Sequence, residues 1–429
     1  MGKTGGYYAT AVRNGVWNFV TPGGKPFFSL GMNGVHNQIL DQAHWLRTDL
    51  MRKYGGDGEW FVRWADAKAE QVAEHGFNTL GAWHEPYYWG NGTPKTVEIR
   101  MSRFAPKVNT DWGTGFPEVF DVKFKASVER ACIDCFHSGR GQALLSDPGL
   151  IGYYTDNEIH WWGHGGKWGN NDPGEGSNCT NLVDDYLELP PTAAGKKAWI
   201  AMLVERHGTI EQLNETWGAE YTAFDDLAAI AVYRADRPER LEADKVAFLR
   251  KIAEEYYRTT SDALKRYDPN RLNLGNRMVG TSTPEVVLDV MKDYADVITL
   301  NFYSFDLPKS WMARIHERTG LPFMITEFSF CAGAADGFLL NTNGARNVLV
   351  RSQERRGEAY RTFIEDAARL PYIVGLHWFA LYDYGNPNGL IGNYGLLDLA
   401  DEPWASFAEA ARSANESVLR TRETEAGSR

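Results

Sequence analysis

Short apolar runs alternate with amphipathic stretches along most of the 429 residues. A continuous apolar run is typical of a buried parallel strand, and the amphipathic stretches have the pattern and length of surface helices. The expected strands are 26–32, 76–82, 96–101, 149–155, 271–275, 295–300, 322–326 and 372–378. The expected helices are 60–75, 120–136, 193–205, 242–266, 283–294, 308–319 and 344–369. Eight strand–helix units predict an α/β fold, specifically a (β/α)8 TIM barrel.

The spacing between these units is uneven, and it predicts a long insertion after the fourth strand. More than a hundred residues separate the fourth expected strand from the fifth. Long loops at the carboxyl end of a barrel strand commonly form part of the active-site wall. We therefore expect a single domain over 1–411, with the insertion at about 159–240. A polar tail at 412–429 is expected to fray.

Two of the expected strands end in a glutamate, Glu158 and Glu327. The carboxyl ends of barrel strands carry the chemistry of this fold, and two carboxylates that face one cavity are the minimum for cleaving a glycosidic bond. A single strand-end Glu caps a strand about as often as it reacts, but two of them favour catalysis. Asn157 precedes Glu158 and can bind a sugar hydroxyl without adding charge. The pair Asn214-Glu215 has helical spacing and is given little weight.

Composition excludes several other classes of protein. The net charge of −11 argues against a nucleic-acid partner, which requires a basic surface. No apolar stretch is long enough to span a membrane, and the N-terminus lacks the pattern of a signal peptide. Because a signal could have been removed, the localisation stays open between the cytoplasm and a secreted or periplasmic site. Cys132 and Cys135 have metal-like spacing, but no second pair completes a site, so packing is expected.

Aromatic residues are unusually frequent, with 15 Trp, 20 Tyr and 21 Phe. Many of them follow the second, fourth and eighth expected strands, among them Trp83, Trp161, Trp162 and Trp168. The apolar faces of pyranose rings stack on aromatic rings, so this distribution predicts a saccharide cleft at the top of the barrel. Ordinary packing is the competing interpretation for about half of them.

Several segments carry a family resemblance. The sequence Thr155-Asp156-Asn157-Glu158 after an apolar strand resembles the acid/base motif of the clan A retaining glycoside hydrolases. Within this clan, the chain resembles the family 42 β-galactosidases and the family 50 β-agarases. Segments 15–28, 213–218 and 393–403 add to the resemblance, which covers most of the chain. The additional domains typical of both families, and the zinc-binding Cys cluster of some family 42 members, are not part of it.

The resemblance implies roles for particular residues. Glu158 would be the acid/base and Glu327 the nucleophile, with Asn157 binding the hydroxyl next to the reacting carbon. Tyr303 resembles the tyrosine that orients the nucleophile, and Trp378 resembles the platform under the reacting sugar. The further expected substrate contacts are Asn33, Trp83, His84, Arg277, Trp161 and Trp162. Asn33, His84 and Arg277 could equally be residues that fix loops by hydrogen bonds.

Three other functions compete with glycoside cleavage. A metal-dependent barrel hydrolase would need a His-x-His motif after the first strand, where His36 stands alone. A phosphate-binding barrel would need basic residues in the Gly-rich segment 385–395, which has none. A non-catalytic carbohydrate-binding protein would share the aromatic residues without needing two strand-end Glu.

The sequence therefore predicts a retaining β-glycoside hydrolase that acts on a β-linked, galactose-type oligo- or polysaccharide. A β-glucosidase, β-mannosidase or cellulase-type enzyme of the same clan is the alternative within the class. Neither a cofactor nor a metal is expected, and neither nucleic acid nor a membrane is expected as a partner. The sequence is compatible with a homo-oligomer.

Overall fold

The computed structural model describes residues 5–37, 50–109, 114–165, 176–332, 341, 348–385 and 391–427. Within these residues, the central feature is a nine-stranded parallel sheet with the order β10-β9-β6-β5-β4-β16-β13-β12-β11. Its strands are β4 (Ser29–Met32), β5 (Thr79–Leu80), β6 (Lys95–Glu98), β9 (Leu150–Tyr154), β10 (Leu272–Asn273), β11 (Met278–Val279), β12 (Ile298–Asn301), β13 (Phe323–Phe328) and β16 (Ile373–Trp378). Each of the expected strands has a counterpart among them.

The sheet curls because the strands at its two ends are consecutive in the chain. β10 pairs with β9, β11 pairs with β12, and only residues 274–277 lie between β10 and β11. Gly275 makes the break possible, since it adopts a φ of +67° and a Cβ there would lie 2.8 Å from the side chain of Met291. The result is an α/β fold with a curled parallel sheet, consistent with a TIM-like barrel.

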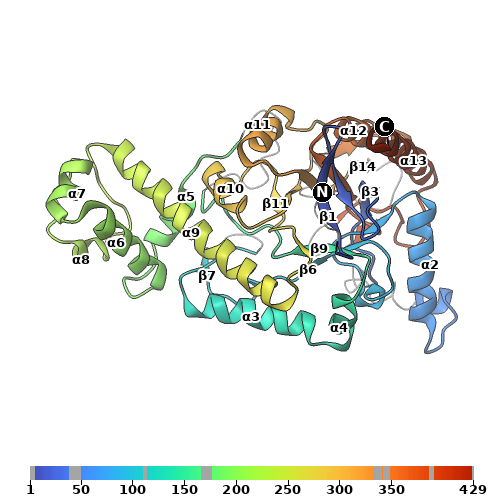
Figure 1. The fold of residues 1–429 in the computed structure, drawn as a ribbon, viewed down its shortest axis with the longest axis horizontal. Coiled ribbons are helices and arrows are strands. Elements are labelled where there is room, and N and C mark those ends of the chain that lie inside the picture. Colours follow the sequence, from blue (N-terminus) through green and yellow to red (C-terminus); the bar gives the residue numbers. More distant parts are fainter. Residues whose placement is uncertain are drawn as a thin grey trace.

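Helices cover the outside of this sheet (Figure 1). They are α2 (Trp60–Glu74), α3 (Val122–Phe136), α4 (Gly139–Leu145), α9 (Pro238–Tyr267), α10 (Glu285–Met291), α11 (Lys309–Thr319), α12 (Gln353–Ala368) and α13 (Ala405–Gly427). The expected helix at 344–369 begins later, at α12, where the Ser352 side chain accepts a hydrogen bond from the amide of Arg355. Residues 344–347 lie outside the described residues. Cys132 and Cys135 lie in α3 as free thiols, and burial raises the pKa of each to about 12.

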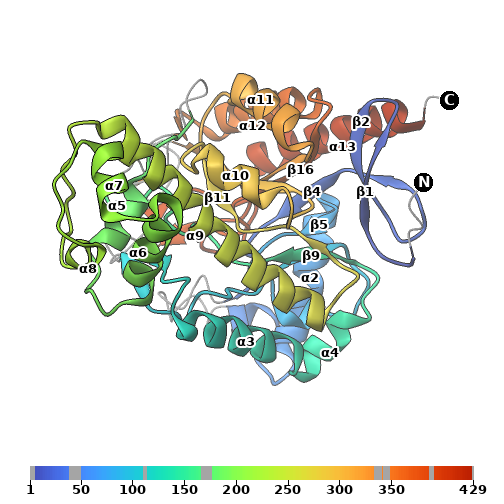
Figure 2. The ribbon, with the colours of Figure 1, turned by 60° about the vertical axis from the view of Figure 1, so that its left-hand side comes forward.

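Between β9 and β10 the chain forms the helices α5 (Asn181–Leu187), α6 (Ala194–His207), α7 (Ile210–Trp217) and α8 (Phe224–Leu227) before the long α9. Of these, α6, α7 and α8 form a lobe at one side of the molecule (Figures 1 and 2). Asn214 and Glu215 lie in α7, as their helical spacing indicated. The lobe packs around its own aromatic residues, with Trp199 and Trp217 stacked 6.5 Å apart.

The amino-terminal end of the curled sheet is closed by the strands β1 (Ala9–Arg13), β2 (Val16–Val20) and β3 (Pro26–Phe27). Tyr8 and Phe19 from this segment belong to the same buried cluster as Ile151, Met324 and Val374, which come from strands of the curled sheet. The Trp17 amide donates a hydrogen bond of 2.7 Å to the carbonyl of Pro371, just before β16. This cluster fills the amino-terminal end of the curled sheet, and the strand-end residues singled out in the sequence lie at the opposite, carboxyl end.

The polar tail expected at 412–429 differs in the structure, where residues 412–427 are part of α13 and 428–429 lie outside the described residues. Ala408, Ala411, Ala414 and Val418 form its buried face, with the spacing of a helix. Arg422 is also buried, and its guanidinium donates hydrogen bonds to the carbonyls of Trp17, Ala368 and Ile373. A stripe of small apolar residues and one buried Arg therefore dock this helix, which the polar composition of the segment did not predict.

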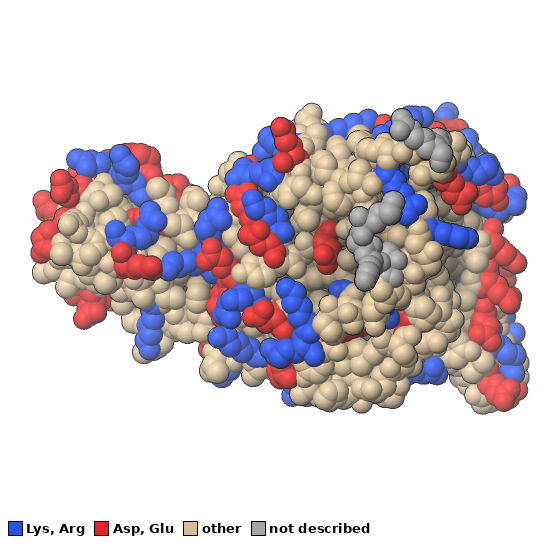
Figure 3. Space-filling model, viewed as in Figure 1, with Lys and Arg blue, Asp and Glu red and all other residues tan. Residues whose placement is uncertain are grey.

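The surface carries charges of both signs. Figure 3 shows Lys and Arg interspersed with Asp and Glu across one face, including the lobe of α6, α7 and α8. Among the described helices, none has the length and apolar character needed to cross a membrane.

Candidate active site

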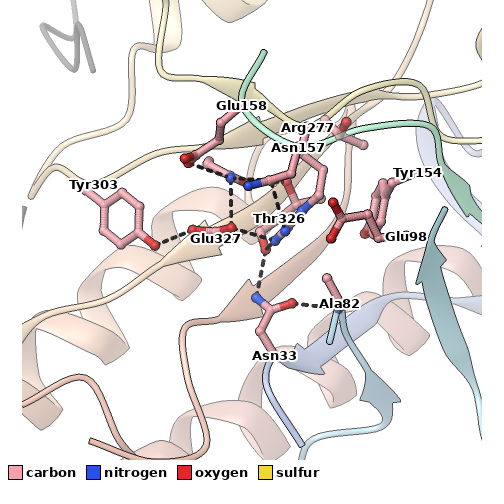
Figure 4. A network of polar contacts seen from close by, with 12 residues as sticks. Asn33, Ala82, Glu98, Tyr154, Asn157, Glu158, Arg277, Tyr303, Thr326 and Glu327 are labelled. Atoms are coloured by element: carbon pink, nitrogen blue, oxygen red, sulfur yellow. Dashed lines mark hydrogen bonds and ion pairs between the residues drawn. The ribbon is translucent and has the colours of Figure 1, made fainter. Parts of the chain in front are cut away.

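The carboxylates of Glu158 and Glu327 lie close together (Figure 4), and both accept a hydrogen bond from the side chain of Asn301. Asn301 is the last residue of β12, and its Nδ2 lies 2.9 Å from Oε1 of Glu158 and 2.8 Å from Oε1 of Glu327. These two oxygens therefore lie within about 5.7 Å of each other. Retaining glycosidases place their carboxyl groups about 5–5.5 Å apart, and inverting enzymes about 6.5–9.5 Å apart. One donor shared by both carboxylates is compatible with the shorter separation.

Arg277, from the break between β10 and β11, is fully buried beside this pair. Its Nη2 lies 2.9 Å from Oε1 of Glu327 and donates to the carbonyl of Thr326 at 2.8 Å. Its Nη1 donates to Oδ1 of Asn157 at 3.1 Å. The guanidinium also lies 4.4 Å from the centre of the Trp83 ring, a cation–π contact. One cation thus fixes the strand-end residues next to both glutamates.

The two glutamates differ in how many donors they receive. Glu327 is contacted by Arg277, by Nδ2 of Asn301 and by the hydroxyl of Tyr303, which donates to Oε2. For Glu158, the hydrogen bond from Asn301 is the side-chain contact that the structure shows. Burial raises the pKa of both carboxyl groups; Arg277 and Tyr303 oppose the rise at Glu327, and Asn301 and Arg277 oppose it at Glu158. Glu327 therefore has more donors than Glu158, but burial and the nearby Glu158 carboxylate still raise its pKa to about 8.

The backbone around Glu158 is held in an uncommon conformation. Glu158 has a φ of +51°, and its amide donates to the carbonyl of Arg277 at 2.9 Å. Behind it, the buried carboxylate of Asp156 accepts hydrogen bonds from the amide and hydroxyl of Ser102, both at 2.8 Å, and from the hydroxyl of Tyr256 at 2.8 Å. Burial raises the pKa of Asp156 to about 6. These contacts aim the Glu158 side chain at its partner.

Two expected substrate contacts have their polar atoms occupied by the protein. Asn33 is fully buried; its Nδ2 donates to the carbonyl of Thr326 and its Oδ1 accepts from the amide of Ala82, both at 2.8 Å. In His84, Nδ1 lies 2.6 Å from the carbonyl of Gly81, and Nε2 accepts from Nε1 of Trp89 at 3.0 Å. Burial lowers the pKa of His84 to about 4 and keeps the ring neutral. Both residues act in the structure as fixing residues of strand-end loops, which was the competing interpretation.

Trp378, expected as a platform for the sugar, packs outside the curled sheet instead. It is fully buried, lies 4.8 Å from the ring of Phe407 in α13, and donates from Nε1 to the carbonyl of Tyr394. The next residue, Phe379, faces the site side: its ring contacts those of Trp83 at 5.9 Å and Tyr303 at 6.2 Å. The pairing of β13 with β16 shifts register before Phe328 and Trp378, so strict alternation does not assign their faces.

Trp161 and Trp162 also differ from the expected cleft wall. Their exposed fractions are 1% and 4%. Trp161 stacks on Tyr257 of α9 at 5.7 Å with an interplanar angle of 9°, and its Nε1 donates to Oδ1 of Asn276. Trp162 packs against the ring of His160 at 4.6 Å. Because both rings are buried, neither is available to a sugar. Their packing anchors the segment after β9 instead. Trp168 lies outside the described residues.

Three residues at the site were not anticipated, namely Asn301, Phe379 and Glu98, the last residue of β6. Asn301 and Phe379 each follow an expected strand, so strand-end position could have found them. Glu98 lies inside the expected strand 96–101, which ends earlier in the structure, at Glu98. Within the described ranges, no group of His, Cys, Asp and Glu side chains has the arrangement of a metal site. The site is therefore one of carboxylates, amides, one guanidinium and aromatic rings.

Two carboxylates that approach each other from the carboxyl ends of β9 and β13 in a barrel-like fold form an arrangement that glycoside hydrolases use. No family model matches the chain. In sequence it is similar to β-agarase B of Vibrio sp. (strain JT0107), with 27% identity over 405 residues, 91% of this chain and 40% of that protein. It is also similar to β-agarase A of the same strain, with 26% identity over 381 residues, 82% of this chain and 36% of that protein. The chain thus spans less than half of the length of either agarase.

Solved structures extend the comparison. A crystal structure of an agarase matches with a TM-score of 0.82 and 23% identity, covering 97% of this chain and 66% of that one. An exo-β-agarase matches with a TM-score of 0.81, 22% identity and the same coverage. A β-galactosidase from the psychrophilic Marinomonas ef1 matches with a TM-score of 0.57 and 13% identity, covering 92% and 59%. The chain is β-agarase-like in sequence and in fold, as the motifs indicated, and it resembles β-galactosidases in fold.

Proposed function

We propose that this protein is a retaining glycoside hydrolase that cleaves β-linked galactans of the agarose type. The observation that carries the proposal is the pair of carboxylates, Glu158 and Glu327, within reach of one Asn301 amide at the ends of β9, β13 and β12. The scaffold would be a (β/α)8 barrel over 1–411, whose fifth strand is split into β10 and β11, with the insertion at about 159–240 on its fourth loop.

In the first step, an oxygen of Glu327 attacks the anomeric carbon while Glu158 donates its proton to the glycosidic oxygen. The bond between the anomeric carbon and that oxygen breaks, and a covalent glycosyl-enzyme ester forms. In the second step, Glu158 removes a proton from water, whose oxygen attacks the same carbon and releases Glu327. Two inversions give net retention of configuration.

The donors around the pair support this division of roles. The nucleophile has to be ionised, and Glu327 receives contacts from Arg277, Tyr303 and Asn301 that stabilise its charge. The acid has to hold a proton, and Glu158 is buried with fewer donors to its carboxylate. Asn157 stands next to the acid, where its amide can bind the hydroxyl beside the reacting carbon.

The substrate class rests on the relatives. Both named sequence relatives are β-agarases, and the matches cover 91% and 82% of this chain. A galactan chain would lie across the carboxyl ends of the strands, because the amino-terminal end is filled by Tyr8, Phe19 and their neighbours. Phe379, Trp83 and Tyr303 supply aromatic surface beside the carboxylates for the reacting sugar.

The test is hydrolysis of agarose, agaro-oligosaccharides and an aryl β-galactoside, with product configuration followed by proton NMR. The wild type should release the β-anomer first. Glu327→Ala should abolish turnover on every substrate, whereas Glu158→Ala should keep measurable activity on the aryl glycoside, which needs little protonation, and should be rescued by azide. Near-native hydrolysis by Glu327→Ala would contradict the assignment. Saccharide binding without any hydrolysis by the wild type would indicate a binding protein instead.

A further inference from the structure

A third carboxylate, that of Glu98, lies buried beside the catalytic pair. Glu98 ends β6 and is in register with Tyr154 of β9. Its side chain is 3% exposed, and Oε1 accepts from Nε of Arg100 at 3.2 Å. Oε2 is buried and has no hydrogen-bond partner among the described residues. Figure 4 shows the Glu98 carboxylate directed from β6 into the cluster that contains Arg277 and Glu327.

A carboxylate in this position needs an explanation. Buried acidic groups are almost always paired, because an unpaired charge loses its hydration without compensation. Arg100 is a weak partner, since its side chain is 55% exposed and therefore screened by water. Glu98 makes no ion pair with Arg277 within 4 Å, while Arg277 contacts Glu327 directly. Its negative charge therefore remains largely uncompensated within the site.

The groups around the pair leave few fixed charges. The titratable and charged residues that face it are Glu98 from β6, Tyr154 from β9, Arg277 between β10 and β11, Tyr303 after β12, and Tyr384 and Tyr394 beside the short strands β17 (Tyr384–Gly385) and β18 (Ile391–Gly392). Burial raises the pKa of each of these tyrosines, so all four are neutral during turnover. Arg277 and Glu98 are left as the charged residues that act on Glu158 and Glu327.

We propose that Glu98 is a positioning residue for the proton, whose buried charge keeps one proton on the Glu158–Glu327 pair. The inference rests on the proposed function. With Arg277 balancing the Glu327 carboxylate, a second negative charge on Glu158 would face the Glu98 charge in a poorly hydrated space. In agreement with this geometry, the Glu98 carboxylate acts to raise the pKa of both glutamates. Glu98 thus holds the general acid in its active, protonated form at higher pH.

The direct test is the pH dependence of kcat/KM for Glu98→Gln, which keeps the shape of the side chain and removes its charge. The alkaline limb of this profile reports the loss of the proton from the free enzyme's catalytic pair. We expect its midpoint to fall by about one pH unit, because a like charge nearby no longer opposes ionisation. Glu98→Asp keeps the charge and should keep a midpoint close to that of the wild type.

A surface substitution separates this local effect from net charge. Glu409→Gln removes the same charge from an exposed position on α13, where the side chain is 66% exposed. It should leave the alkaline midpoint in place. Added salt should also leave the effect of Glu98→Gln largely intact, because salt screens buried charges poorly.

Arg100 provides a second variant. Its side chain is exposed, so we expect the variant protein to fold. Arg100→Met removes the hydrogen bond to Oε1 of Glu98 and one positive charge, so the alkaline midpoint should rise by a few tenths of a pH unit. If Glu98→Gln does not fold, Arg100→Met is the test. A rise in its alkaline midpoint supports the inference, and an unchanged midpoint overturns it. If Glu98→Gln folds and loses kcat with its alkaline midpoint unchanged, Glu98 is structural and the inference is wrong.

The failure of this inference differs from failure of the proposed function. If Glu327→Ala retained hydrolysis, the catalytic pair itself would be misassigned. Glu327→Ala could instead abolish hydrolysis while Glu98→Gln and Arg100→Met both keep the wild-type pH profile of kcat/KM. The catalytic pair would then be supported, and the role inferred for Glu98 would be wrong.

Discussion

Two buried carboxylate clusters in this protein have opposite chemistry. Asp401, between the curled sheet and α13, lies 2.6 Å from Nζ of Lys68 and 2.9 Å from Nζ of Lys53. At the candidate active site, a single guanidinium, that of Arg277, accompanies Glu158 and Glu327. The Asp401 carboxylate therefore contacts two cations, one of which it shares with the exposed Glu402, whereas Glu158 and Glu327 share one cation.

The pKa directions follow this ratio. Burial alone would raise the pKa of Asp401, but Lys68 and Lys53 bring it below its ordinary value. Burial also raises the pKa of Glu158 and Glu327, and Arg277 does not reverse the rise at either. A buried carboxylate with surplus cations stays ionised and holds the fold together. A pair that shares one cation retains a proton that it can give to a substrate.

The largest expected effect separates the two clusters by activity. Glu327→Gln should lower kcat/KM by at least about 10⁴-fold, because the amide cannot form the glycosyl ester. Its melting temperature should change little, because the pair retains one proton and Glu158 can carry the negative charge opposite Arg277 once residue 327 is neutral. Initial rates and thermal melts on one preparation test both statements. A variant that loses activity together with several degrees of melting temperature would place Glu327 with the structural carboxylates.

The second expected effect is the converse, a loss of stability without loss of chemistry. Asp401→Asn should lower the free energy of unfolding by about 3–5 kcal/mol, because Lys68 would remain buried without its counter-charge. Asn also tolerates the φ of +66° at this position. Urea denaturation measures the loss, and kcat of the folded protein should be unchanged. Glu402→Ala is the control: this residue also contacts Lys53 but is 64% exposed, so a change within about 0.5 kcal/mol is expected.

The fold was largely predictable from the sequence because each sheet strand is a short apolar run with its own turn or helix after it. The split of the fifth strand was not, since it depends on the φ of Gly275 and on the approach of Met291. The helix over 405–427 was missed because its buried face consists of Ala and Val, which give a weak pattern between charged residues. Its docking through Arg422 is a tertiary contact that local patterns do not contain.

At the site, strand-end position found Glu158, Glu327, Arg277 and Tyr303, which the structure brings together. It could not decide which of two adjacent aromatic residues, Trp378 or Phe379, faces the site, because a register shift in β13 and β16 changes the alternation. The catalytic roles remain predictions. What the sequence lacks is the direction of each side chain after a strand has ended.

The third prediction extends the comparison to the aromatic residues beside the site. Trp161→Phe should cost about 2–3 kcal/mol of stability, because it opens space against Tyr257 and removes the hydrogen bond to Asn276. Since Trp161 is buried, kcat/KM should fall equally, if at all, on short and long saccharides. Chemical denaturation and kinetics on an aryl glycoside and a longer oligosaccharide provide the measurement. A loss of kcat/KM confined to the longer substrate would indicate that Trp161 lines the cleft.

The smallest expected effect uses a third buried carboxylate, Asp383, which has an intermediate environment. Burial raises its pKa to about 7, although the Arg356 guanidinium and hydrogen bonds from Asn393, Gly395 and Trp404 oppose the rise. Because the folded pKa lies above the ordinary value of an Asp, protonation stabilises the fold. This stabilisation is complete below about pH 4 and is lost as the pH rises through 7.

Asp383→Asn removes the titrating group. The free energy of unfolding of the variant should therefore not fall as the pH rises through 7. The variant will be less stable than the wild type at pH 5, because Asn offers fewer acceptors to the three donors around it. Between pH 5 and pH 8 the gap should narrow by on the order of 1–2 kcal/mol, measured by urea denaturation at each pH. A gap that stays constant with pH would mean that Asp383 is ionised throughout, like Asp401. One cation per carboxylate would then be enough to fix a charge in this protein, and the protonated state inferred for Glu158 would need a cause other than the shortage of cations.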